Sequence, residues 1–157
     1  MVFKTQQELD DYVEWTKLEL KRMAQHVRDS DLFQEEAVGH AVWTLPHRLF
    51  IGKVWPKSAS SKAYWIISGV DIPTDHIEAS LAETARDAAR HFCMKWQLQS
   101  GRLSALGPAE SNEQTRDESY WEEISVRLRA QAEGLYGLVE QEHLWRRTEG
   151  PLLGLEE

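Results

Sequence analysis

The sequence predicts a single α+β domain, in which a small antiparallel sheet of two or three strands packs against three long helices. Two long segments repeat apolar residues every three to four positions, which is typical of helices with one buried face. Between them lies a segment rich in aromatic and β-branched residues, which favours strands. The expected order is helix, strands, helix, helix, which argues against a repeated parallel βαβ arrangement.

The first helix is expected to begin just after residue 5 and to end near Arg28. Thr5 and Glu8 have the spacing of a capping box, and Phe3 is placed to pack against the first turns. The apolar stripe of this helix consists of Leu9, Tyr12, Val13, Thr16, Leu20, Met23, Ala24 and Val27. We expect this stripe to face the sheet.

Strands are expected within residues 41–55 and over residues 63–68. Pro46 and Gly52 interrupt the first segment, which indicates two strands or one broken strand. Residues 63–68 are apolar at consecutive positions, which is typical of a strand covered on both faces. Three of the seven tryptophans fall on the expected strands: Trp43, Trp55 and Trp65. The sequence leaves open whether helices cover both sheet faces or leave one aromatic face exposed.

A second long helix is expected to end at about Ser100, because the glycine that follows is a common helix stop. Its start is ambiguous, since residues 75–78 and residues 80–83 both have capping-box spacing. One face of this segment carries Ile77, Leu81, Ala85, Ala88, Phe92, Trp96 and Gln99.

The remaining chain is expected to form a linker, a third helix and a tail. Residues 104–117 are polar and contain Gly and Pro, which is typical of a linker. A third helix is expected over about residues 117–142. We therefore expect residues 1–145 to form the domain and residues 146–157 to form a flexible C-terminal tail.

Composition narrows the class of protein. The chain has 157 residues and a formal charge of −8, and this acidic balance argues against nucleic-acid binding, which uses a basic patch. The single cysteine, Cys93, excludes an intrachain disulfide and cysteine-pair redox or zinc motifs, and indicates a reducing compartment. The N-terminal residues lack an apolar signal core, and no segment is apolar enough to span a bilayer. We expect a cytoplasmic protein with no membrane partner.

The strongest candidate site is the loop at residues 71–76, between the most apolar strand and a long helix. Loops held by such elements often carry binding groups, and two carboxylates with an imidazole can serve acid–base chemistry or hold a ligand. The alternative interpretation is structural, because every residue of this loop also suits a turn or a helix cap. The candidate ligand- or partner-binding residues are Trp65, Asp71, Pro73, Thr74, Asp75, His76 and His91.

The sequence contains no recognisable catalytic or cofactor motif. Nucleotide-binding glycine patterns, the nucleophile elbow and H-E-x-x-H are absent, and the six histidines include no tight pair. We therefore predict no catalytic residue, no metal site and no cofactor. Cys93 is interpreted as a small buried hydrophobic residue.

One stretch of the sequence resembles a known family. The stretch comprises a strand led by Trp65, a Gly-x-Asp-x-Pro-Thr-Asp loop over residues 69–75, and a helix with Phe92 and Trp96. It is similar to a small bacterial family catalogued as a domain of unknown function, over about residues 10–100. The resemblance implies a bacterial cytosolic protein and brings no activity with it.

Two functions from different classes follow. The first is a non-catalytic protein-binding or regulatory module, which binds an unknown partner or a second copy of itself; the tryptophan content and acidic flanks favour it. The second is a small-molecule enzyme or ligand-binding protein that uses the loop at residues 71–76.

Overall fold

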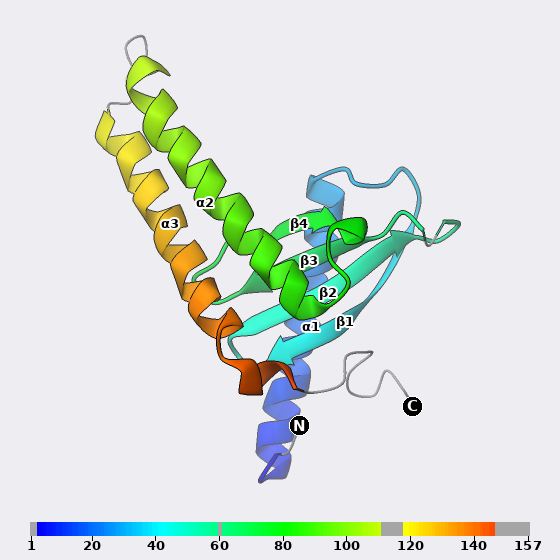
Figure 1. Cartoon of the computed structure of the whole chain (residues 1–157). Helices are drawn as coiled ribbons and strands as arrows, with labels where there is room; N and C mark the ends of the chain where they lie inside the picture. The colour runs from blue at the N-terminus through cyan, green and yellow to red at the C-terminus, as the bar shows by residue number, and fades with distance from the viewer. Residues whose placement is uncertain (1–2, 60, 111–117, 147–157) are drawn as a thin grey trace.

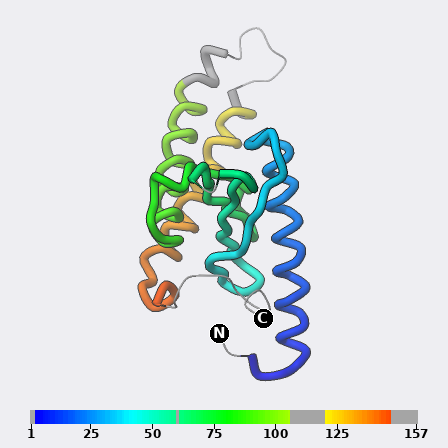
Figure 2. The backbone as a smooth tube through the Cα atoms, turned by 90° about the vertical axis from the view of Figure 1, so that its right-hand side faces the viewer, coloured from blue at the N-terminus to red at the C-terminus, as the bar shows by residue number. Residues whose placement is uncertain are grey.

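The computed structural model describes residues 3–59, 61–110 and 118–146 and has three layers. A four-stranded antiparallel sheet lies between helix α1 (Gln6–Asp29) on one face and helices α2 (Ala85–Glu110) and α3 (Glu118–Val139) on the other, as Figures 1 and 2 show. Among the described residues, none of the helices is both long and apolar enough to cross a bilayer. The predicted α+β class is confirmed.

The sheet consists of β1 (Ala37–Leu45), β2 (Leu49–Pro56), β3 (Tyr64–Gly69) and β4 (Asp75–Glu78), in that order across the sheet. The sequence predicted two or three strands, whereas the sheet has four; the strand that was not predicted is β4. Residues 75–78, expected as loop or helix start, instead pair with β3, with Ile77 opposite Trp65. Four residues are too few to show a strand periodicity, so only the long-range pairing reveals this strand.

Helix α1 begins as the sequence predicts. Thr5 is the N-cap, and its hydroxyl accepts a hydrogen bond from the backbone amide of Glu8 at 3.1 Å. Phe3 packs on Tyr12, with ring centroids 5.0 Å apart. The predicted stripe is slightly out of phase, because the buried face includes the carboxylate residue Glu19 and Ala24 is exposed.

Three polar contacts join α1 to three different strands. The Tyr12 hydroxyl bonds to that of Thr44 on β1, and the Ser68 hydroxyl of β3 donates to the buried Glu19 carboxylate, both at 2.5 Å. The third contact joins His26 to β4. Helix α1 also lies very close to β2. A Cβ on Gly52 of β2 would be only 2.7 Å from the sulfur of Met23 on α1. This helix layer is therefore fixed by polar contacts as well as by apolar burial.

The two sheet faces bury separate apolar clusters, so helices cover both faces. The larger cluster lies under α2 and α3 and contains Trp65, Phe92 and Trp96, each at most 1% exposed. The smaller lies under α1 and contains Met23 and Phe50. No large aromatic sheet face remains open among the described residues, which answers the question that the sequence left open.

Helices α2 and α3 form an antiparallel pair. Helix α2 continues to Glu110, so the predicted stop at Gly101 and the linker over residues 104–110 were wrong; residues 111–117 lie outside the described part of the chain. Ser100 and Ser125 are both buried, and each donates its hydroxyl to the other's backbone carbonyl, at 2.7 and 2.9 Å. This packing outweighs the helix propensity of a single glycine, which is lower by only about 1 kcal/mol.

A short 3₁₀ helix, η3 (Glu142–Trp145), follows α3 and returns to the sheet. Trp145 stacks on Trp43 of β1 there, and the Trp43 indole donates to the carbonyl of Leu144 at 3.2 Å. The predicted flexible tail, residues 146–157, falls almost entirely outside the described residues, since only Arg146 is described.

Candidate functional site

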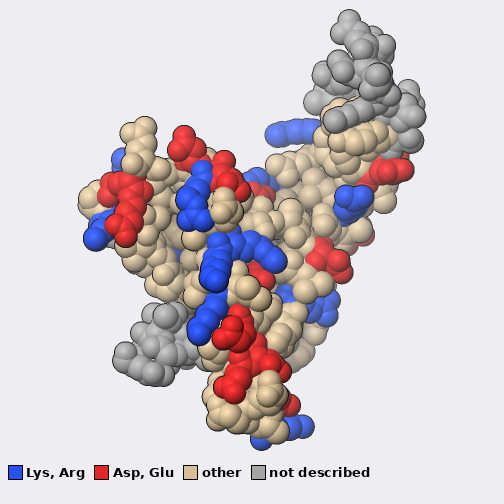
Figure 3. Space-filling view, turned by 180° about the vertical axis from the view of Figure 1, so that it is seen from behind, with Lys and Arg blue, Asp and Glu red and all other residues tan. Residues whose placement is uncertain are grey.

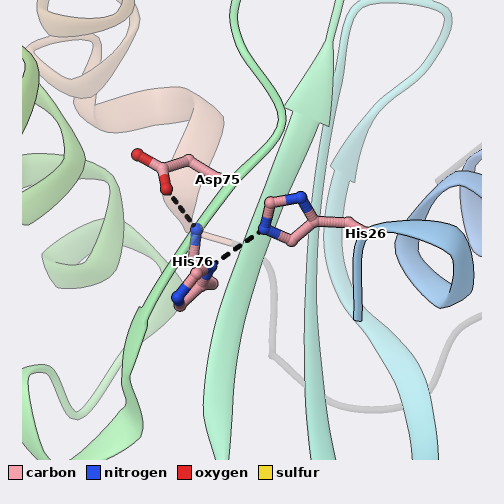
Figure 4. Close-up of side chains that lie close together, drawn as sticks. All are labelled: His26, Asp75 and His76. Carbon is pink, nitrogen blue, oxygen red and sulfur yellow. Dashed lines mark hydrogen bonds between the residues drawn. The ribbon is translucent and has the colours of Figure 1, made fainter. Parts of the chain in front are cut away.

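Strand β4 lies at one edge of the sheet and directs consecutive side chains to opposite faces. Asp75 points towards α2, where it contacts Lys95 and Trp96, and His76 points towards α1, where it contacts His26. Figure 4 shows these histidines meeting from α1 and β4, with the Asp75 carboxylate beside the His76 backbone. The strand thus gathers side chains from three elements at one sheet edge.

The Asp75 carboxylate is held by three donors. Its Oδ1 accepts from the Lys95 ammonium and from the backbone amide of His76, both at 2.8 Å, and its Oδ2 accepts from the Trp96 indole at 2.9 Å. Lys95 also donates to the His76 carbonyl at 3.0 Å. The Asp75–Lys95 ion pair therefore satisfies both backbone polar groups of His76 with charged side chains, which protects this edge against pairing with another strand.

The two histidine rings share a hydrogen bond. His26 Nε2 lies 2.9 Å from His76 Nδ1, and the Tyr64 ring packs edge-on against His76 with centroids 5.5 Å apart. Burial lowers the pKa of both histidines below the ordinary value, and the Lys95 charge acts in the same direction, while the Asp75 charge opposes it. The lowered pKa values favour the neutral form of both rings, in which one ring nitrogen donates to the other.

His26, Asp75 and His76 could also hold a metal ion. One ligating atom from each lies within 4.8 Å of the other two, and all three residues are half-buried. Two neutral imidazoles and a carboxylate form a donor set that suits zinc and its first-row neighbours. The nearby Lys95 ammonium opposes a bound cation, because like charges repel at short range.

A groove of about 550 Å³ runs beside this cluster, between β4 and α2. His76, His91, Lys95 and Arg102 supply polar lining, while Leu81, Met94 and Leu98 supply apolar lining. A second groove, of about 700 Å³, lies at the other end of the loop and is lined by Asp71, Arg48 and Arg127. The loop that the sequence singled out therefore touches two separate surface hollows.

The structure divides the predicted site residues into four groups. His76 and His91 line the same groove, with Asp75 adjoining it through Lys95. Asp71 is exposed at the second groove. Trp65 is 1% exposed and donates its indole N–H to the Ala82 carbonyl at 3.0 Å, so it belongs to the core. Pro73 and Thr74 are half-buried within the loop.

Sequence reasoning missed His26 and Lys95. His26 carries a usable signal, because it lies three residues after Met23 and seven after Glu19, on the buried side of α1. Its partner lies fifty residues away, on a strand that the sequence does not reveal. The histidine pair is consequently a product of tertiary packing.

The face formed by α1 carries mixed charge. Lys17, Lys21 and Arg22 are exposed in the middle of the helix. Figure 3, seen from this side, shows basic side chains over the middle of the face, with acidic side chains above and below them. This face therefore lacks the continuous positive surface that nucleic-acid binding uses.

Comparisons with known proteins identify a family for this chain but no activity. No curated protein and no solved structure matches the chain. The family described as Domain of unknown function (DUF4826) matches residues 9–145 through its sequence model, which is most of the chain. The matched residues contain the whole sheet, α2, α3, the cluster on β4 and all of α1 except its first three residues, and the chain belongs to this family.

Proposed function

We propose that the protein is a non-catalytic binding module, which takes a short segment of a partner protein into the groove between β4 and α2. The segment that fits carries both apolar and acidic side chains. The observation that carries this proposal is the concentration of exposed apolar side chains in a groove that Arg102 also lines.

Three apolar residues of the groove are more than half exposed. Leu81 is 51% exposed, and Met94 and Leu98 are each 57% exposed. Met94 and Leu98 lie one turn apart on α2, so they present a continuous apolar strip. Neighbouring exposed apolar residues of this kind are typical of surfaces that bind a partner.

The charged residues around this strip determine whether an acidic or a basic segment binds there. Arg102 is exposed and forms no ion pair with any described residue, and Lys95 and His91 lie on the same side of α2. Glu78 contributes one negative charge to the lining. Lys95 is already paired with Asp75, so Arg102 is the groove cation that an acidic side chain of the occupant would pair with.

The occupant is recognised by its side chains, with little contribution from added strand pairing. The backbone amide and carbonyl of His76 are already bonded to Asp75 and Lys95. An extended peptide would have to displace that ion pair before it could extend the sheet at this position.

Two features support a non-catalytic role. The Asp75 carboxylate is engaged by three donors, which leaves it poorly placed to exchange protons with a substrate. Burial raises the pKa of the Cys93 thiol to about 12, so the thiolate nucleophile is scarce at neutral pH.

Selection from a random peptide library against the immobilised full chain tests this function. We expect enrichment of peptides with Asp or Glu beside Leu, Ile or Phe, and loss of their binding in Met94→Ser/Leu98→Ser and in Arg102→Glu. Val126→Ser is the matched control, because Val126 is 44% exposed on α3 outside the groove. Failure to enrich any peptide over the double variant, or enrichment of basic peptides, would overturn the proposal.

A second copy of the chain is the competing occupant. Light scattering at two protein concentrations distinguishes it, because self-occupancy gives a dimer whose mass falls on dilution and in Met94→Ser/Leu98→Ser. A monomer at both concentrations would show that a second copy of the chain does not occupy the groove.

A second candidate function is the binding of a small anionic ligand in the groove at Asp71. That groove lies in the size range of ligand sites, and Arg48 and Arg127 line it without an ion-pair partner among the described residues. Thermal shifts with inorganic phosphate and with citrate, lost in Arg127→Gln, would support it, and the absence of any shift at millimolar ligand would reject it.

A further inference from the structure

We propose that His26, His76 and Asp75 form a binding site for a divalent transition-metal ion, with Zn²⁺ as the favoured ion, at the contact between α1 and β4. The site is separate from the peptide groove of the proposed function, although His76 contributes to both.

The histidine geometry is close to that of a metal-bound pair. His26 Nε2 and His76 Nδ1 face each other at 2.9 Å. Two imidazole nitrogens bound to one tetrahedral Zn²⁺ are about 3.3 Å apart, given Zn–N bonds of about 2.0–2.1 Å. An ion would replace the proton between the two nitrogens: they would separate by about 0.4 Å, and each ring would turn so that its lone pair points at the ion.

Asp75 supplies the third ligand. Its Oδ1 is the oxygen nearer the histidines, and it already accepts from Lys95 and from the His76 amide, so a bound ion would compete with the Lys95 ammonium for it. The Trp96 contact also fixes the orientation of the carboxylate, as the supporting hydrogen bonds of metal ligands do. With two imidazoles and one carboxylate, the site offers three protein ligands and leaves a position for water.

The donor set determines the class of metal. Imidazole nitrogen suits Zn²⁺, Cu²⁺ and Ni²⁺, whereas Mg²⁺ and Ca²⁺ prefer oxygen ligands throughout. Two of the three donors here are imidazoles, so the alkaline-earth ions should bind poorly. All three residues are half-buried, so an ion can reach them from solvent.

Lys95 gives this site a distinctive property. Its ammonium lies 2.8 Å from Asp75 Oδ1 and competes with a metal ion for the same carboxylate. Removing this positive charge should therefore strengthen metal binding, whereas removal of a surface lysine far from a bound ion would have little effect.

Calorimetric titration of the tag-free, metal-depleted full chain with ZnCl₂ tests the proposal. We expect one Zn²⁺ per chain, with affinity at least about tenfold lower in His26→Gln and in His76→Gln. His91→Gln is the matched control, since His91 lies on α2 beside the same groove but outside the cluster, and it should bind Zn²⁺ like the wild type. Lys95→Met should bind more tightly than the wild type.

A measurement on the wild-type chain keeps the test decisive even where a histidine variant fails to fold. Co²⁺ bound at this site should show the visible absorption of a low-coordinate nitrogen and oxygen environment, and added Zn²⁺ should displace it. Absence of saturable one-to-one binding, equal affinity in the wild type and both folded histidine variants, or weaker binding in Lys95→Met would each overturn the proposal. Peptide selection carried out with a chelator present tests the groove independently of the metal.

Discussion

The indole rings of Trp43 and Trp145 stack with their centroids 3.9 Å apart and their planes 13° from parallel. Trp43 belongs to β1, and Trp145 lies in η3, about one hundred residues later in the chain. The Trp145 indole also donates to the Leu138 carbonyl at 2.9 Å, near the end of α3. This contact therefore joins the edge strand at one side of the sheet to the last described helix.

Truncation of this stack should destabilise the whole domain. We expect Trp145→Ala to lower the free energy of unfolding by about 2–3 kcal/mol, because it removes a half-buried aromatic ring and its stacking partner contact. Urea denaturation followed by circular dichroism measures this loss. Trp145→Phe keeps a ring over Trp43 and loses only the indole hydrogen bond, so it should cost about 1 kcal/mol. Equal losses in the two variants would show that the stack itself contributes nothing.

Two glycines should respond to alanine with opposite signs. Gly69 has φ +156°, and a Cβ there would collide with the backbone carbonyl of Arg48, so Gly69→Ala should destabilise the protein by about 3 kcal/mol. Gly101 lies within α2, and beyond the helix's own backbone there is no atom within 4 Å of its potential Cβ among the described residues. Gly101→Ala should therefore stabilise the protein by about 0.5–1 kcal/mol. Thermal melts of both variants side by side check the two signs, and a destabilised Gly101→Ala would contradict the helical assignment there.

Stability of the metal-free protein should fall as the pH drops below about 6.5. Burial lowers the pKa of His26 and His76 in the folded state, so the unfolded chain binds protons that the folded protein excludes. Their stabilising contribution is complete above the unfolded pKa and is lost as the pH falls towards the folded pKa. Asp75 and Asp29 oppose this shift at His26, and Lys95 reinforces it.

Urea unfolding between pH 8 and pH 5, with a chelator present, measures this dependence. We expect His26→Gln/His76→Gln to show a flatter profile than the wild type over this range. His91→Gln, which leaves the histidine pair intact, should retain the wild-type slope. A wild-type profile that is flat, or that rises on acidification, would contradict the lowered pKa values.

The thiol of Cys93 should be unreactive in the folded protein. Cys93 is 3% exposed, and burial raises its pKa to about 12, so both access and the thiolate fraction are low. A disulfide reagent such as DTNB should label the chain only as fast as it unfolds, and at once in denaturant. Stoichiometric labelling within minutes in buffer would contradict the buried position.

The long amphipathic elements could be predicted from the sequence because their signals are local. The Thr5 cap and the periodic stripe identify α1, and the run of apolar residues at 63–68 identifies β3. In α2 the predicted face with Ala85, Phe92 and Trp96 is the face that is buried. The interpretation of Cys93 as a small buried residue is also confirmed.

The edge of the sheet and the histidine pair could not be predicted, because distant residues determine them. Asp75 has the spacing of a helix cap, but its carboxylate instead accepts from the His76 amide at the sheet edge. The residue that caps the start of α2 is Thr84, whose hydroxyl accepts from the backbone amide of Asp87. That choice depends on Lys95 and Trp96, twenty residues away. Local sequence patterns identified the loop as a candidate site. The residues that its side chains contact, His26 on α1 and Lys95 and Trp96 on α2, could not be identified in that way.

The strands lie side by side in the order in which they are synthesised, and each pairs with its neighbour in the chain. No strand has to wait for a distant segment, so loop closure is entropically cheap and early pairing is fast. On a ribosome, α1 and the sheet can assemble while α2 and α3 are still being translated. Until those helices arrive, the sheet face that they cover is exposed, so this interval is when the nascent chain is most vulnerable to aggregation.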